Sequence, residues 1–209
     1  MLSLENEIKW LNILNNTRIV PKFIDYNLNI ETPYIIIEYI NFKRLDKHNF
    51  SSLDEKLKCL ISILDAINII HQNKIIYCDL KPQQIFIDSN FNVKIIDFDI
   101  SSINSKEMLS KYGNINYCSP KKTNKKITTY YDIFSLRIIF CKLILSNLAF
   151  ERNKDNIKNL IVYSKINRIE NKKLNSIFYK AIDKNYSFRY KIVNEFKCDL
   201  IKFLDKKKG

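Results

Sequence analysis

The stretch that decides the fold runs from residue 77 to residue 99 and reads YCDLKPQQIFIDSNFNVKIIDFD. Two aspartates, Asp79 and Asp97, each follow an apolar run, and the Ile/Phe/Val-rich segment between them is broken by Asp-Ser-Asn. This pattern predicts a loop, a short β-hairpin and a second loop. We therefore expect both carboxylates to lie at strand edges and to face one site.

The same stretch resembles the catalytic and metal-binding loops of eukaryotic-type protein kinases, H-R-D-L-K-P-x-N followed by D-F-G. The run from Asp79 to Pro82 and the pair Asp97-Phe98 stand as that family has them, and the spacing between them is the family's. Four positions depart from the pattern, which has His, Arg, Asn and Gly where this chain has Tyr77, Cys78, Gln84 and Asp99. The resemblance implies a kinase-like fold and a phosphotransfer site.

By this resemblance each motif residue has an expected role in phosphoryl transfer, which needs positioning and charge neutralisation. Asp79 would accept or orient the proton of the attacking hydroxyl, and Lys81 would neutralise charge on the transferred group. Asp97 would bind Mg²⁺ that bridges the phosphates of ATP. Gln84 stands where the family holds a second ion, and its amide oxygen is a suitable ligand for a hard cation.

The departures from the pattern leave an alternative open. Cys78 in place of Arg removes the cation that would pair with a phosphorylated activation loop, whereas Asp99 in place of Gly tolerates a positive φ. In this alternative, Asp79 and Asp97 would be buried, hydrogen-bonded residues that organise turns in a catalytically inactive kinase fold. Such a pseudokinase would act by binding a protein partner, for example another kinase.

Composition bounds the fold class and the partners. A chain of 209 residues with 46% hydrophobic content can bury one good core. The net charge of +13 raises nucleic acid as a partner, but few of the 35 basic residues are Arg, the residue that base edges and phosphates favour. We expect a solvated, Lys-rich surface and no specific nucleic acid.

Cysteine and glycine usage excludes other sites. The five cysteines are well separated and form no C-x-x-C pair, so neither a zinc cluster nor a disulfide framework is supported. Only Gly113 and Gly209 are glycines, which excludes a P-loop, a Rossmann fingerprint and a Gly-rich phosphate flap. No apolar run is long enough for a signal peptide or a membrane span, so we expect a cytoplasmic protein.

The first forty residues predict one helix and two strands. Apolar spacing favours a helix over 4–14. This helix resembles the αC helix of kinases, with Glu7 at the position of the glutamate that pairs with the β3 lysine in that family. The alternative is that Glu7 is a solvated acid in the first turn of the helix. Strands are expected over 21–26 and 34–39. Glu38, Tyr39 and Ile40 fall where the kinase hinge would bind adenine through backbone groups.

The remainder predicts a mainly helical lobe. Ser52-x-x-Glu55 is a capping box that opens a helix through Ile70, and a buried helix is expected over 132–145. We expect Asp132 at its start to accept backbone N–H groups of the catalytic loop. Two or three amphipathic helices are expected over 153–203, with Arg189 at the position of a conserved kinase arginine.

We therefore predict an α+β, protein-kinase-like fold. Residues 1–40 would form a reduced N-lobe, 41–205 a helical C-lobe and 206–209 a frayed basic tail. The segments 113–120 and 131–136 resemble the G-T-x-x-Y-x-[AS]-P-E and αF motifs of protein kinases, so a protein substrate is favoured. The predicted function is an ATP- and Mg²⁺-dependent protein Ser/Thr kinase. A pseudokinase is the alternative, and a small-molecule kinase is a minor one.

Overall fold

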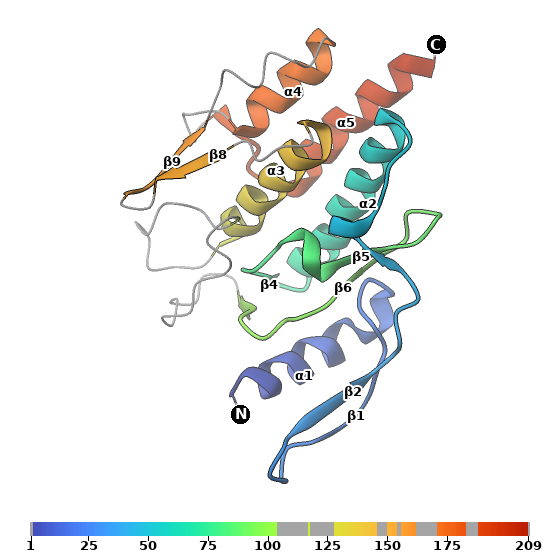
Figure 1. Ribbon diagram of the computed structural model, residues 1–209, viewed down its shortest axis with the longest axis vertical. Coiled ribbons are helices and arrows are strands. Elements are labelled where there is room, and N and C mark those ends of the chain that lie inside the picture. Colours follow the sequence, from blue (N-terminus) through green and yellow to red (C-terminus); the bar gives the residue numbers. More distant parts are fainter. Residues whose placement is uncertain are drawn as a thin grey trace.

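The computed structural model describes residues 2–103, 117, 128–145, 150–153, 156–161, 171–182 and 188–208. Its N-terminal part forms one end of the molecule, as Figure 1 shows, and the long helices lie beyond it. This part consists of α1 (Leu2–Leu14), the 3-10 turn η1 (Asn15–Thr17) and the antiparallel strands β1 (Phe23–Asn27) and β2 (Tyr34–Ile37). The helix and both strands lie where the sequence predicts them.

The β1–β2 hairpin has two different faces. Phe23, Ile35 and Ile37 pack against the hydrophobic core. The other face is exposed and carries Ile24, Tyr34 and Ile36, whereas Tyr26 pairs with Ile35 and its ring lies 6.0 Å from that of Phe23. Among the described strands, β1 and β2 pair only with each other, so this small sheet has two unpaired edges.

The predicted hairpin between the two aspartates is present. Strands β5 (Ile85–Ile87) and β6 (Val93–Ile95) pair antiparallel, and β3 (Lys43–Arg44) completes a three-stranded sheet in the order β3-β5-β6. The turn is held by Asp88, whose Oδ1 accepts the backbone N–H groups of Asn90 and Asn92 at 2.9 and 2.8 Å. Asx turns of this kind are why Asp and Asn mark hairpins in sequences.

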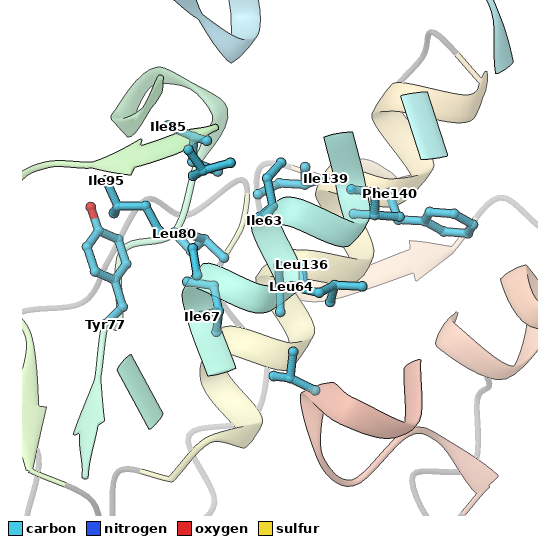
Figure 2. Close-up of a cluster of buried hydrophobic side chains, with 14 of the residues drawn as sticks. Ile63, Leu64, Ile67, Tyr77, Leu80, Ile85, Ile95, Leu136, Ile139 and Phe140 are labelled. Atoms are coloured by element: carbon cyan, nitrogen blue, oxygen red, sulfur yellow. The ribbon is translucent and has the colours of Figure 1, made fainter. Parts of the chain in front are cut away.

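Helix α2 (Leu53–Gln72) begins at the predicted capping box. The Ser52 hydroxyl accepts the Glu55 N–H at 3.2 Å, and the Glu55 carboxylate accepts the backbone N–H of Ser51, one residue earlier than the standard motif, at 2.7 Å. One face of the helix is buried and carries Leu57, Leu60, Ile63, Leu64, Ile67 and Ile70. Figure 2 shows part of this face in the core that also receives Leu136, Ile139 and Phe140.

Helices α3 (Tyr130–Leu145) and α5 (Val193–Lys208) pack on α2, and α4 (Lys172–Ile182) packs on α5 and α3. Helix α3 is buried over most of its described length, as its apolar sequence predicts. Helix α5 lies along α2 (Figure 1). Lys197 pairs with Asp65, and Lys207 pairs with Asp54 at 2.6 Å. None of the described helices combines the length and hydropathy needed to cross a membrane.

The two or three amphipathic helices expected over 153–203 are represented by α4 and α5, and strands β8 (Phe150–Asn153) and β9 (Asn156–Ile161) form an antiparallel hairpin before them that was not predicted. Short apolar runs do not distinguish helix from strand, and β9 is rich in Ile and Asn. The tail expected at 206–209 is helical through Lys208, since Phe203 is buried and Lys207 bonds to α2.

Candidate active site

A buried carboxylate shapes the loop after β4 (Ile75–Ile76). Asp132, in the first turn of α3, accepts the backbone N–H of Tyr77 through Oδ2 and that of Cys78 through Oδ1, both at 2.8 Å. His71 at the end of α2 contacts the same carboxylate at 2.9 Å. The role predicted for Asp132 is confirmed. Cys78 adopts a left-handed conformation with φ of 72°, which the two hydrogen bonds hold in place.

The side chains of Asp79 and Lys81, which follow in this loop, contact each other. The Lys81 ammonium lies 2.5 Å from Asp79 Oδ2. The exposed fractions of the two side chains are 10% for Asp79 and 21% for Lys81, so both are mostly buried but reach solvent. A charge-assisted contact of this length fixes both groups relative to each other.

The side chains of Gln84 and Asp97 form a second contact of the site. Gln84 ends the 3-10 turn η3 (Pro82–Gln84), and its buried amide nitrogen donates to Asp97 Oδ2. Its amide oxygen lies 3.2 Å from the Tyr77 hydroxyl, which also donates to the Ile96 carbonyl. The Tyr77 ring packs edge-to-face on Phe98 with centroids 5.0 Å apart. Tyr77, the departure from His, thereby braces both loops.

The charges of the two pairs act on each other. Burial raises the pKa of Asp97, and the nearby carboxylates of Asp99 and Asp79 raise it further, while the Lys81 ammonium lowers it. The structure thus brings Asp79, Lys81, Gln84 and Asp97 together, from loops that precede and follow the β5–β6 hairpin. Tyr77 and Asp99 complete the arrangement, and each was identified in the sequence only as a departure from the pattern.

Glu7 of α1 also belongs to this site, which contradicts its interpretation as a solvated acid. Its Oε2 accepts the backbone N–H of Phe98 at 2.8 Å. Burial and the Asp97 charge raise the pKa of Glu7 from 4.5 to about 7. Together with Asp97, Asp99 and two isoleucines of β2, it lines a cavity of about 230 Å³. An acid-lined cavity of this kind attracts cations.

Asn6 anchors the helix that carries Glu7. Its side-chain nitrogen lies 3.1, 2.6 and 2.9 Å from the carbonyl oxygens of Phe98, Asp99 and Ser101. Trp10 donates to the Ser101 carbonyl as well, at 3.1 Å. Sequence reasoning missed Asn6 because its partners are backbone atoms far along the chain, which leave no sequence signal.

The residues predicted to form the hinge are Glu38, Tyr39 and Ile40. Within the described part of the chain, the hydrogen bonds of Glu38 are to Lys22 and Lys94 and not to the residues of the candidate site. The Glu38 N–H donates to the Lys22 carbonyl at 2.8 Å, and its carboxylate accepts the Lys22 N–H at 2.9 Å and pairs with Lys94. Lys94 holds the pKa of Glu38 below its usual value. Tyr39 is 87% exposed and Ile40 is half-buried. Adenine binding through these residues stays a prediction.

Two other sequence signals have different outcomes. Arg189 is buried, and its Nη1 lies 3.4 Å from the Tyr130 hydroxyl at the start of α3. The segment 113–120 lies outside the described residues apart from Tyr117, whose carbonyl accepts the Ser135 hydroxyl at 2.9 Å. Its resemblance to the substrate-side kinase motif therefore stays a prediction.

Comparison with known proteins agrees with this geometry. The protein kinase domain family matches residues 2–207, so the chain belongs to that family. Its relatives include the SNF1-related protein kinase catalytic subunit alpha KIN12 of Arabidopsis thaliana, 29% identical over 177 residues, which are 80% of this chain and 34% of the relative. The probable serine/threonine-protein kinase PknB of Lactococcus lactis is 26% identical over 186 residues, covering 80% and 29%. The chain thus spans about a third of the length of these relatives.

A solved structure shares the fold. The kinase PK-1 of Cydia pomonella granulovirus superposes with a TM-score of 0.72 over 92% of this chain and 78% of that one, at 17% identity. The chain has this kinase-like fold, with strands in its N-terminal part and mostly helices later. The relatives of this chain include Ser/Thr protein kinases. Members of the family typically use ATP and Mg²⁺.

The side chains present fit a magnesium ion. Mg²⁺ in such enzymes is held by one or two carboxylates together with substrate phosphates, so a full protein cage is not needed. No cluster of three or more His, Cys, Asp or Glu ligands occurs in the described part of the chain. Asp97 and Gln84 already touch. Rotating the Gln84 amide by 180° exchanges its nitrogen and oxygen without changing its shape. Its oxygen would then face Asp97, and the two oxygens could bind the same hard cation.

Proposed function

We propose that this chain transfers the γ-phosphate of ATP to a Ser or Thr hydroxyl of a protein in a Mg²⁺-dependent reaction. One observation carries the proposal: Lys81 pairs with Asp79, and Gln84, three residues further along the same loop, contacts Asp97 of the loop after the β5–β6 hairpin. Phosphoryl transfer needs an acceptor for the hydroxyl proton, cations on the phosphates and a fixed geometry between them. This set of side chains supplies all three.

Each residue has a separate task in the proposal. Asp79 orients the attacking hydroxyl and accepts its proton, and Lys81 neutralises charge that develops on the transferred phosphoryl group. Asp97 and Gln84 would hold Mg²⁺, which neutralises charge on the nucleotide phosphates when bound. Glu7 and Asn6 fix the backbone of residues 98–101 next to Asp97 and so keep its carboxylate in position.

The choice of a Ser/Thr hydroxyl in a protein rests on similarity to relatives. Those reported above carry the words protein kinase or serine/threonine-protein kinase in their names. Lys81 stands two residues after Asp79, as in Ser/Thr kinases, and the segment 131–136 resembles a protein-kinase motif. Because the chain spans about a third of those proteins, its substrate is inferred from the shared loops only.

A protein-binding pseudokinase is the second candidate, and the β1–β2 hairpin favours it. Three large apolar side chains, Ile24, Tyr34 and Ile36, are exposed on one face of this sheet, and its edges are unpaired among the described strands. Exposed strand edges pair readily with an added strand of a partner. In this case the buried contacts of Asp97 would stabilise turns and would not bind a nucleotide.

Thermal unfolding with and without Mg·ATP separates the two candidates. At about 100 times Kd, the ligand should stabilise the wild type by about 2.7 kcal/mol and raise Tm by about 5–10 °C. The shift should vanish in Asp97→Asn, because the metal loses its carboxylate. Asp205→Asn is the matched control, since it makes the same chemical change on an exposed turn of α5 and should keep the shift. A wild type without any shift would favour the pseudokinase.

A further inference from the structure

A second cavity lies behind the residues predicted as the hinge. Its volume is about 600 Å³, within the range of ligand-binding pockets, and it lies between the turn after α1, the start of β1, the end of β2 and the β5–β6 hairpin. It contains none of Asp79, Lys81, Gln84 and Asp97. We call it the basic pocket and define it by Arg18, Val20, Lys22, Phe42, Val93 and Lys94.

Hydrogen bonds between its walls give the basic pocket a fixed shape. The Ile95 N–H donates to the Ile19 carbonyl at 2.7 Å, which joins the hairpin to the turn after α1. Glu38 bonds to the backbone of Lys22 and to the side chain of Lys94, which joins β2 to the other two walls. The pocket is therefore part of the folded framework and does not depend on a ligand to form.

The rim of the pocket carries uncompensated positive charge. It has three cations and one acid, Glu38, whose carboxylate is already engaged by Lys94 and a backbone N–H. Within the described part of the chain, neither Arg18 nor Lys22 forms an ion pair, and both are exposed. Two basic side chains are thus available to an anionic ligand.

The floor of the pocket is apolar. Ile19, Val20 and Val93 are buried beneath it, and Phe42 forms part of the wall. Asn16 and Asn92 also line the pocket. A ligand that matches both regions needs carboxylates beside an apolar side chain, which inorganic phosphate or a nucleic-acid backbone lacks.

We propose that the basic pocket docks an acidic segment of a protein partner, an extended peptide in which Glu or Asp residues flank one aliphatic side chain. The aliphatic group covers the Val20–Val93 floor, and the carboxylates meet Arg18 and Lys22. Bidentate contact with the Arg18 guanidinium would fix the register of the peptide. This proposal is independent of catalysis, because it uses none of the groups proposed to act on phosphate.

Fluorescence anisotropy with a labelled peptide, Gly-Glu-Glu-Ile-Glu-Glu-Gly, tests the proposal on the full chain. The double variant Arg18→Ala/Lys22→Ala should bind at least 10-fold more weakly than the wild type. The control Lys172→Ala/Lys173→Ala removes the same charge from exposed residues of α4 and should bind within 2-fold of the wild type. Equal losses in both variants would overturn the proposal, since binding would then reflect only the net charge of +13.

A second variant removes unfolding as an explanation. Arg18 has a φ of 60°, a left-handed conformation that glycine adopts without steric strain, so Arg18→Gly should change Tm little. It should still weaken peptide binding several-fold. Replacing the central Ile of the peptide by Ser should weaken binding as well. Unchanged affinity in either test would overturn the proposal, as would an oligothymidylate that outcompetes the peptide at equal charge.

Discussion

Replacing Asp132 with Ala is expected to lower the free energy of unfolding by about 3–5 kcal/mol, the largest effect on stability that we predict. The Asp132 carboxylate is fully buried and accepts the N–H groups of Tyr77 and Cys78 while contacting His71. Its removal leaves two buried donors without an acceptor, each at a cost of about 1–3 kcal/mol. Urea denaturation followed by circular dichroism measures the change.

Two further variants make this test specific. Asp132→Asn keeps one acceptor oxygen at nearly the same shape, so it should lose about half as much stability as Asp132→Ala. Asp205→Ala removes an exposed carboxylate on α5 and should have little effect. A loss below about 1 kcal/mol in Asp132→Ala would mean that the loop keeps its shape without this residue.

Replacing Asp79 with Asn is expected to lower the rate of phosphate transfer by about 10²–10⁴-fold. The amide keeps the size of the side chain but cannot accept the hydroxyl proton. Mg·ATP binding should be preserved, because Asp97 and Gln84 contact each other and not Asp79. Transfer of radiolabel from ATP to dephosphorylated casein at saturating Mg·ATP, followed by phosphoamino-acid analysis, measures the rate.

The Lys81 contact requires a control for this experiment. Asp79→Asn also weakens the 2.5 Å ion pair, so a displaced Lys81 could lower the rate indirectly. Lys81→Met removes the ammonium while leaving the carboxylate, and it should leave a residual rate that Asp79→Asn lacks. If Asp79→Asn kept more than a tenth of the wild-type rate, Asp79 would not be the proton acceptor.

The loops of the site follow from the sequence because their determinants are local. The motif residues are separated by one hairpin, and the Asp-Ser-Asn at 88–90 specifies its turn. The contact of Asp132 with the loop at Tyr77 and Cys78 was also predictable, because the segments that hold the two partners, 77–84 and 131–136, both resemble kinase motifs. The helices α2 and α3 were predictable from a capping box and from an unbroken apolar run, respectively.

Features that depend on distant contacts were not predictable. The hydrogen bond from Phe98 to Glu7 joins residues 91 positions apart, and periodicity alone permits a solvated Glu7 equally well. Cys78 and Asp97 have positive φ although neither is Gly, because surrounding contacts impose the conformation. The β8–β9 hairpin was not predicted, because its short apolar run is compatible with either a helix or a strand.

Paramagnetic relaxation in solution tests the central claim most directly, namely that Asp79, Lys81, Gln84 and Asp97 surround one metal-bound phosphate. With Mn²⁺ in place of Mg²⁺, addition of ATP should broaden the backbone amide resonances of residues 79–81, 83–84 and 97–99, and Asp97→Asn should abolish the effect. Broadening centred on another region, or none at all with ATP present, would contradict the account and favour a kinase fold that serves only to bind proteins.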